Sequence, residues 1–468
     1  MRMVLVMRMK LLLASTMFRR SGGRILQPAS KYKAYFLASA LILGLSANVP
    51  SAHAQLTTLY EFQGSPDGES PYGGLVEDST GAFYGTTEAG GKNSCGSTGC
   101  GTVYKLAGTK ESWVYSFKGY PKDGQTPGYI NLVTDGKGNF YGTTAYGGNG
   151  PCKLNGISVG CGTIFEITSA GVETPLYSFQ WGPKDGAGPN STLILDSATG
   201  VLYGTTEGGG NLVENCMEGA GCGTVFQFTI STKKEKVLYE FCTNKTTCPD
   251  GAGPAGMLAQ DSAGNIYGTT EGGGAHLGGT AFKLILSTGV ESVLYSFCAK
   301  TNCADGEGPA GGLTLKASTG ILYGTTISGG TGVCGQETTG GGTLFQITTA
   351  GKNFRVLHDF PSSGGDGCNP WGTVTMDTAG NLYGTTFLGG DGNPPLGTVY
   401  EYSASGKESV LYSFDGVGDI GAAPLDTLIH EKRKLYGTTV GGGGATVCSL
   451  LINGENLGGC GTVFELTP

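Results

Sequence analysis

The sequence predicts an all-β protein, a seven-bladed β-propeller whose blades are four-stranded antiparallel sheets. Four short runs rich in β-branched and aromatic residues recur along the chain, separated by turn residues. One string, Tyr-Gly-Thr-Thr, recurs at intervals of 53 to 64 residues. Four strands per repeat at this period are typical of a propeller, whereas the coils of a β-solenoid are usually much shorter. The string begins at Tyr84, Tyr141, Tyr203, Tyr267, Tyr323, Tyr383 and Tyr436.

Each repeat is expected to supply its four strands in a fixed order. The first run is 73–78, with counterparts at 130–135, 191–196, 256–261, 311–316, 372–377 and 426–431. A turn follows, as at 261–265, where Gly and Asn adopt positive φ at low cost. Tyr-Gly-Thr-Thr is the second run. The third begins with Gly-Thr and covers 101–106, 162–167, 223–228, 279–284, 342–347, 397–402 and 461–466. The fourth resembles Leu-Tyr-Ser-Phe, at 114–117, 176–179, 238–241, 294–297, 357–360 and 411–414.

The order of runs at the two chain ends predicts how the ring closes. The first strand-like run, 58–62, is of the fourth type and precedes any run of the first type. The last run, 461–466, is of the third type, so the last repeat lacks its outer strand. We therefore expect 58–62 to pair beside 461–466, which completes the last blade and removes an exposed sheet edge.

Residues 1–54 predict a secretory signal with a long basic segment in front. They hold eight Lys or Arg and no Asp or Glu, and an apolar run covers 35–49. Ala52-His53-Ala54 is a small-x-small cleavage pattern, so cleavage is expected after Ala54. A retained signal anchor is the alternative. We expect residues 55–468 to form a single propeller domain, exported to the periplasm or secreted.

The charge of this exported part excludes several classes of partner. It carries 21 Lys or Arg against 37 Asp or Glu, a formal charge of −16. Such a surface repels phosphate backbones and anionic lipid, which disfavours nucleic-acid and membrane-surface binding. No apolar stretch after residue 54 approaches membrane length. We expect a monomer without a cofactor, and a ligand that is neutral, polyhydroxylated or cationic.

Fourteen cysteines lie between the strand motifs and indicate disulfides rather than metal ligands. No cluster has Cys-x-x-Cys spacing, and only three His follow residue 54, so no metal site is expected. Cys334 and Cys368 are left over after neighbours are paired, and both fall in loops that leave an up-and-down blade on the same face. The expected pairs are Cys95–Cys100, Cys152–Cys161, Cys216–Cys222, Cys242–Cys248, Cys298–Cys303, Cys334–Cys368 and Cys448–Cys460.

Two sets of acidic residues are candidates for ligand binding. An Asp-Gly-x-x-Pro connector precedes each first strand and could form an acidic ring near the axis, although Asp-Gly and Pro also make turns. Glu follows Tyr-Gly-Thr-Thr in three repeats, where a binding site or a catalytic carboxylate pair could arise, or where Glu is simply solvated. The candidates are Asp67, Asp123, Asp185, Asp250, Asp305, Asp366, Asp419, Glu88, Glu207 and Glu271.

The combined motif resembles the Gloeo/Verruco (GloVer) tandem repeat of bacterial exported proteins. The resemblance rests on Leu-Tyr-Gly-Thr-Thr, Gly-Gly, Gly-Thr-Val-Phe, Leu-Tyr-Ser-Phe and Asp-Gly-x-x-Pro, and extends over residues 56–468. It implies an exported, propeller-like repeat domain and brings no catalytic residues with it. We expect a binding or scaffold propeller that recognises a glycan, a small molecule or a protein on its disulfide-rich loops. The alternative is a propeller hydrolase or lyase acting on extracellular polysaccharide.

Overall fold

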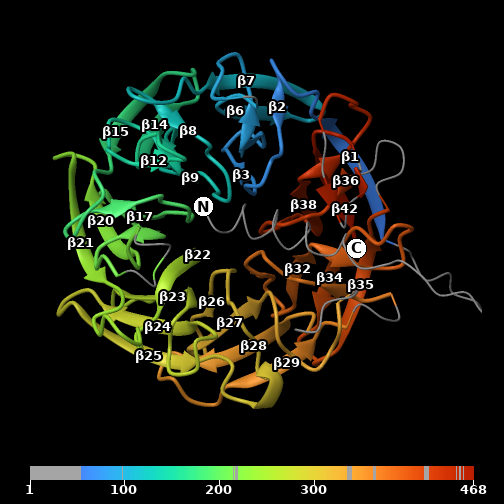
Figure 1. Ribbon diagram of the computed structural model, residues 1–468. Helices are drawn as coiled ribbons and strands as arrows, with labels where there is room; N and C mark the ends of the chain where they lie inside the picture. Colours follow the sequence, from blue (N-terminus) through green and yellow to red (C-terminus); the bar gives the residue numbers. More distant parts are fainter. Residues whose placement is uncertain are drawn as a thin grey trace, which may run out of the picture.

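Seven blades form a closed ring around a central axis (Figure 1). The computed structural model describes residues 54–468 except 97, 214–215, 217–219, 335–339, 362–364, 416–420, 449–450, 453–454 and 457. The predicted signal segment, up to residue 53, lies outside the described residues, as does the candidate Asp419. Each blade is a four-stranded antiparallel sheet, and in blades 1 to 6 the strands follow one another in sequence from the axis outward. The fold class predicted from the repeat is confirmed.

The strands of blades 1 to 7 follow in this order. The innermost are β3 (Val76–Glu77), β9 (Val133–Thr134), β17 (Ile194–Asp196), β22 (Ala252–Gln260), β26 (Thr314–Lys316), β31 (Thr375–Met376) and β37 (Ile429–Glu431). The second are β4 (Phe83–Thr87), β10 (Asn139–Thr144), β18 (Val201–Thr206), β23 (Asn265–Gly272), β27 (Ile321–Thr326), β32 (Leu382–Thr386) and β38 (Lys434–Thr439).

The outer half of each blade is equally regular. The third strands are β6 (Thr102–Ala107), β14 (Thr163–Thr168), β20 (Thr224–Thr229), β24 (Thr280–Ile285), β28 (Thr343–Thr348), β34 (Thr398–Tyr402) and β42 (Thr462–Thr467). The outermost are β7 (Lys110–Ser116), β15 (Glu173–Ser178), β21 (Lys234–Glu240), β25 (Val290–Ser296), β29 (Arg355–Asp359), β35 (Glu408–Ser413) and β1 (Gln55–Glu61).

The N-terminal strand closes the ring, as predicted. Strand β1 pairs antiparallel with β42, with Leu56 opposite Leu466 and Glu61 opposite Thr462. Residues more than 400 positions apart in the chain thus share blade 7. The last blade thereby gains its outer strand, and its edge is no different from that of the other six.

Six of the innermost strands are shorter than the predicted runs. In blade 1 the run 73–78 was expected, but only Val76–Glu77 is paired. The preceding residues turn toward neighbouring blades instead: the Gly74 amide donates to Asn131 Oδ1 at 2.8 Å, and the Asn131 amide to Thr192 Oγ1 at 2.8 Å. Near the axis the blades are so close that the backbone bonds to the next blade rather than along its own sheet.

The glycine of Tyr-Gly-Thr-Thr is required by the aromatic ring on the third strand. A Cβ at Gly268 would lie 2.6 Å from Cζ of Phe282, and a Cβ at Gly204 would lie 2.7 Å from Cζ of Phe226. The same ring packs edge-on against the last Phe of the preceding blade, for example Phe241 on Phe282 at 5.1 Å between centroids. An aromatic contact of this kind recurs at all seven interfaces, edge-on at six and tilted between Phe360 and Tyr400. The Phe62–Tyr104 pair makes it across the chain ends.

The two threonines of the motif hold strands and blades together. The second one shares a hydrogen bond with the threonine that opens the third strand, as between Thr270 and Thr280 at 2.9 Å. The first one reaches the next blade in five repeats, as where Thr269 donates to the Gly311 carbonyl at 2.9 Å. The recurring motif is therefore used for packing and hydrogen bonding within the ring.

Candidate functional site

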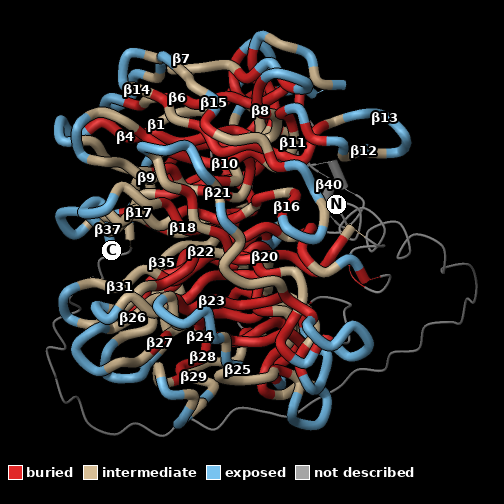
Figure 2. The backbone as a smooth tube through the Cα atoms, turned by 90° about the vertical axis from the view of Figure 1, so that its left-hand side faces the viewer, coloured by how far each residue is buried: buried red, intermediate tan, exposed pale blue. Residues whose placement is uncertain are grey.

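One face of the ring carries the long loops. The connectors into each blade and the loops between second and third strands leave on the same side, as the alternation of four antiparallel strands requires. In Figure 2 the short ladders of these loops lie toward one edge of the disc and innermost strands such as β9, β17 and β31 toward the other. We call the first side the loop face. The ladders are β2 (Gly68–Glu69) with β5 (Ala89–Gly90), β8 (Gly124–Gln125) with β11 (Tyr146–Gly147), β16 (Gly186–Ala187) with β19 (Gly208–Gly209), β30 (Gly367–Cys368) with β33 (Leu388–Gly389) and β36 (Gly421–Ala422) with β39 (Gly441–Gly442).

Seven disulfides cross-link the loops of this face. Four lie within loops between second and third strands, two lie within connectors, and Cys334–Cys368 joins a loop to a connector. The pairs are those expected from the sequence: Cys95–Cys100, Cys152–Cys161, Cys216–Cys222, Cys242–Cys248, Cys298–Cys303, Cys334–Cys368 and Cys448–Cys460. They restrict loops that have little regular structure of their own.

The connector aspartates are bound within the architecture. Asp123 accepts hydrogen bonds from the Tyr115 hydroxyl at 2.8 Å and from the amides of Lys118 at 2.8 Å and Gly124 at 2.7 Å. Asp185 and Asp250 accept from Tyr177 and Tyr239, and Asp67 and Asp305 from Tyr60 and Tyr295. Asp366 is paired with His358 instead. These contacts favour the turn interpretation, and no described connector aspartate lines the central cavity discussed next.

A cavity of about 60 Å³ lies at the axis, at the loop-face ends of the innermost strands. All seven blades contribute to its wall, each through residues just after the connector proline. Several of these positions differ between blades, although Ala-Gly recurs in blades 4 and 5, as Ala255-Gly256 and Ala310-Gly311. Its wall includes the side chains of Tyr72, Tyr129, Asn190, Glu207, Trp371 and Asp426.

Three aromatic side chains line the cavity. Tyr72 and Tyr129 form a tilted pair, and Trp371 is the third. The rings of Tyr72 and Tyr129 are 4.4 Å apart at 40°. Tyr129 has φ +54°, a conformation that bulky side chains rarely adopt, and such strain often marks functional positions. Burial, reinforced by Tyr72 and Glu88, raises the pKa of Tyr129 well above its usual value, so its hydroxyl stays protonated.

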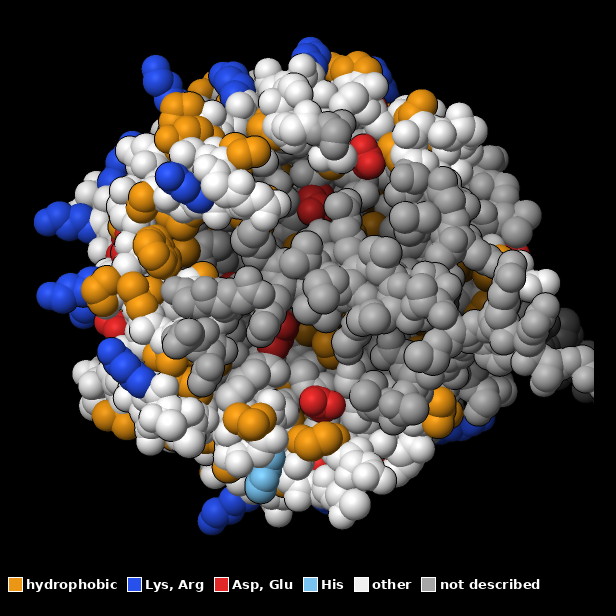
Figure 3. All heavy atoms as spheres, in the orientation of Figure 1, with side chains coloured by type: hydrophobic (Ala, Val, Ile, Leu, Met, Phe, Trp, Pro, Cys, Tyr) orange, Lys and Arg blue, Asp and Glu red, His pale blue; other side chains and the backbone are white. Residues whose placement is uncertain are grey.

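Two acidic residues, Glu207 and Asp426, line the cavity, and Glu271 lies near Glu207 without being part of the wall. Asp426 Oδ2 is buried without a hydrogen-bond partner, and burial raises the pKa of Asp426 to about 6. Glu271 Oε1 is also buried and unpartnered, and burial together with the charge of Glu207 raises the pKa of Glu271 to about 8. Glu207 itself accepts from Asn190 Nδ2 at 2.8 Å. Figure 3 shows acidic side chains near the centre of this face and basic ones around its rim.

The structure thus separates the two sets of predicted site residues. It brings Glu207 to the cavity, with Glu271 beside it, and places Glu88 against Gly128 of the adjoining connector. It distributes the connector aspartates outside the cavity. Sequence reasoning missed Tyr72, Asn190, Trp371 and Asp426. A signal was present: the positions just after the connector proline vary strongly within an otherwise regular repeat.

Comparison with known proteins agrees with the repeat and the ring. The model of the Gloeobacter/Verrucomicrobia repeat family matches residues 44–211, 96–337 and 332–468. No curated protein matches the sequence. Among solved structures, an oligogalacturonate lyase in complex with manganese is similar, with a TM-score of 0.52, 11% identity, and coverage of 89% of this chain and 94% of that one.

Two further solved structures are similar at lower scores. The GH74 xyloglucanase from Xanthomonas campestris has a TM-score of 0.49 and 14% identity, covering 82% of this chain and 52% of that one. A putative 6-phosphogluconolactonase from Bacteroides uniformis has a TM-score of 0.45 and 15% identity, covering 74% of this chain and 86% of that one. Within the described residues, the structure has no helix with the length and apolar character needed to span a bilayer.

Proposed function

We propose that this chain, which belongs to the Gloeobacter/Verrucomicrobia repeat family, is an exported binding propeller whose ligand site is the central cavity of the loop face. The observation that carries the proposal is the convergence of aromatic, amide and carboxyl groups in a cavity to which all seven blades contribute described residues. Repeated residues serve the ring, so aromatic, amide and carboxyl groups that most blades lack at these positions have another use. Seven disulfides support an extracellular or periplasmic location.

The chemistry of the cavity favours a polyhydroxylated ligand, a saccharide above all. The unpartnered oxygen of Asp426, which lines the cavity, can accept a hydrogen bond from a hydroxyl group, which relieves the cost of its burial. Tyr72, Tyr129 and Trp371 have apolar ring faces beside polar groups. A sugar ring likewise combines apolar C–H faces with hydroxyl groups, so the two surfaces are complementary. The acidic surroundings disfavour phosphorylated and carboxylated ligands.

The test begins with residues 55–468 on a glycan array, followed by calorimetry with the glycans that bind. Trp371→Ala and Asp426→Asn should each weaken binding at least about tenfold, because each removes a central contact of about 1.4 kcal/mol or more. Lys137→Ala, an exposed position in a hairpin of the opposite face, is the matched control and should bind like the unaltered protein.

Two results would overturn the proposal. One is binding that survives both central substitutions and is lost on changing the opposite face. The other is turnover: release of reducing ends or of unsaturated sugars from a polysaccharide would show a propeller hydrolase or lyase instead of a binding protein.

A further inference from the structure

A second cluster of polar groups repeats at the outer rim of the blade interfaces. It consists of the connector Asp, a Tyr on the outer strand before it, and a Glu on the outer strand after it. At the interface of blades 2 and 3 these are Asp185, Tyr177 and Glu235, with the Tyr177 hydroxyl 3.0 Å from the carboxylate. The same set occurs as Asp67, Tyr60 and Glu111, as Asp123, Tyr115 and Glu173, and as Asp250, Tyr239 and Glu291.

The interface of blades 5 and 6 departs from this set in two ways. His358 replaces the tyrosine, so an imidazole nitrogen stands where the other blades have a hydroxyl. Pro361 replaces the residue whose amide donates to the aspartate elsewhere, as Lys118 does to Asp123 at 2.8 Å. Proline has no N–H, so Asp366 lacks this donor.

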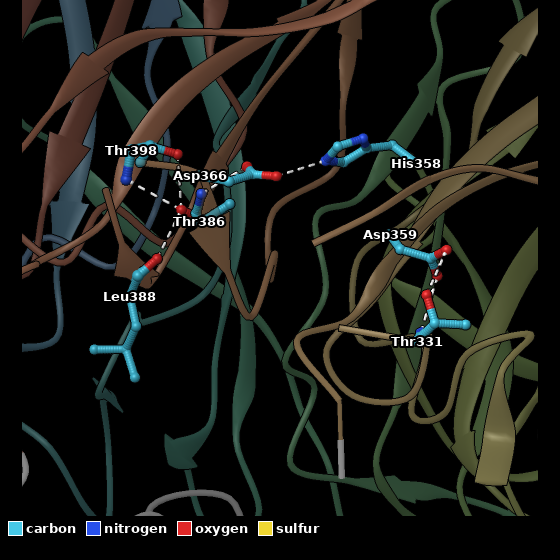
Figure 4. A network of polar contacts seen from close by, with 8 residues as sticks. Thr331, His358, Asp359, Asp366, Thr386, Leu388 and Thr398 are labelled. Carbon is cyan, nitrogen blue, oxygen red and sulfur yellow. Dashed lines mark hydrogen bonds and ion pairs between the residues drawn. The ribbon is translucent and has the colours of Figure 1, made fainter. Parts of the chain in front are cut away.

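The remaining groups form a set of three ligand atoms. His358 Nε2 lies 2.9 Å from Asp366 Oδ2, and Figure 4 shows the imidazole pointing at that carboxylate. The other oxygen of Asp366 is held by the Gly367 amide at 2.7 Å. Glu408 completes the set, with one ligand atom from each residue within 4.8 Å of the other two. Glu408 Oε1 is buried and has no hydrogen-bond partner.

We propose that His358, Asp366 and Glu408 bind a divalent transition-metal ion, preferably Zn²⁺, although the cysteine spacing and the few histidines of the sequence predict no metal site. One imidazole and two carboxylates suit Zn²⁺, which takes such ligands at about 2.0–2.2 Å in a tetrahedral arrangement. Ligand atoms in that arrangement are about 3.3 Å apart, a spacing that small side-chain shifts would reach from the present one. An ion would compensate the two adjacent carboxylates and satisfy the Glu408 oxygen.

The competing interpretation is purely architectural: His358 donates one hydrogen bond to Asp366 as the tyrosines do elsewhere. The tyrosine found at the other interfaces suggests a variant that distinguishes the metal site from the purely architectural interpretation. His358→Tyr restores the residue of the other interfaces and keeps the hydrogen bond to Asp366. It cannot serve as an imidazole ligand, so it removes metal binding without disturbing the architecture.

The experiment uses untagged protein of residues 55–468, freed of metal with a chelator and titrated with Zn²⁺ by calorimetry. One equivalent should bind and raise the melting temperature. Glu408→Gln should weaken binding at least about tenfold, and His358→Tyr should abolish it while the metal-free melting temperature stays the same. His276→Gln and His430→Gln, which alter the other two histidines of the domain, should bind Zn²⁺ normally. X-ray absorption of the loaded protein should show one imidazole ligand with oxygen ligands.

Other outcomes would overturn the proposal. They are the absence of Zn²⁺ binding by the unaltered protein, equal binding by the His358→Tyr variant, or an absorption spectrum without an imidazole. If His358→Tyr melts much lower than the unaltered metal-free protein, His358→Gln replaces it, and undiminished Zn²⁺ binding there would also reject the site. Glycan binding at the central cavity is measured separately and is unaffected by either result.

Discussion

At the scale of single residues, the Tyr-Gly-Thr-Thr motif is constrained by close packing inside the ring. Gly268 lies under the Phe282 ring, so even a methyl group would collide with it. Thr269 and Thr270 are adjacent but make different hydrogen bonds. Thr269 bonds to the next blade, and Thr270 bonds to the third strand of its own blade. The same string can therefore recur seven times because the same neighbours recur around it.

We expect Gly268→Ala to destabilise the domain by about 2–3 kcal/mol, since the added Cβ must displace a buried aromatic ring. Denaturant unfolding measures the change. Gly272→Ala is the matched control in the same strand, because a Cβ there would meet only the Ala252 carbonyl at 3.7 Å. Equal losses for both variants would contradict the packing argument.

Thr269→Val tests the bond between blades. It removes the donor to the Gly311 carbonyl and should cost about 1 kcal/mol of unfolding free energy. Thr205 occupies the same place in blade 3, but its Oγ1 is buried without a partner. Thr205→Val should therefore be neutral or stabilising, and a cost as large as that of Thr269→Val would contradict the assignment.

At the scale of elements, closure of the ring depends on the N-terminal strand β1. It is the sole outer strand of blade 7, and Phe62 continues the edge-on aromatic contacts between blades 7 and 1. Its loss would expose β42 as an unpaired edge and open one blade interface at the same time.

We expect a chain of residues 63–468 to melt well below a chain of residues 54–468, or to associate through the exposed edge. Calorimetry and light scattering after size exclusion distinguish these outcomes. The two chains differ only in β1 and the residues that flank it. A shortened chain that is monomeric and equally stable would show that closure does not depend on this strand.

At the scale of the whole molecule, buried glutamates at the blade interfaces make stability depend on pH. Burial, with the nearby connector aspartate, raises the pKa of Glu111, Glu173 and Glu291 to about 7 and that of Glu235 to about 8. Lys118 opposes the shift at Glu173. One carboxyl oxygen of each is buried without a partner, so the charged form is poorly solvated.

The direction of the pH dependence of stability follows from the linkage between proton binding and folding. A carboxyl group whose folded pKa exceeds its unfolded value contributes stability that is complete below about pH 4.5 and is lost as the pH rises through 7 to 8. We expect the melting temperature to fall between about pH 5 and pH 8. Replacing the four glutamates with glutamine should flatten this part of the profile and raise the melting temperature at pH 9. An unchanged slope would contradict the assignment.

The sequence by itself determined the number of blades, the order of their strands, the closure of the ring and the disulfide pairs. Most of these follow from local signals that repeat along the chain, such as alternating runs, turn residues and the spacing of cysteines. Ring closure follows from the order of the runs at the two chain ends, and the Cys334–Cys368 pair from the cysteines left over after neighbours are paired. Tertiary structure alone decided which polar residues meet. Tyr72 and Asp426 share a cavity because the ring brings the starts of all innermost strands to one axis.

The same holds for the partners of the candidate acids. Asp123 faces a tyrosine eight residues before it, an interaction that a turn makes local, but Glu408 reaches Asp366 only across a blade interface. Periodicity predicts each blade and leaves open which side chains of adjacent blades come into contact. Those contacts depend on how the blades pack, and the pKa values and ligand chemistry of the site depend on them in turn.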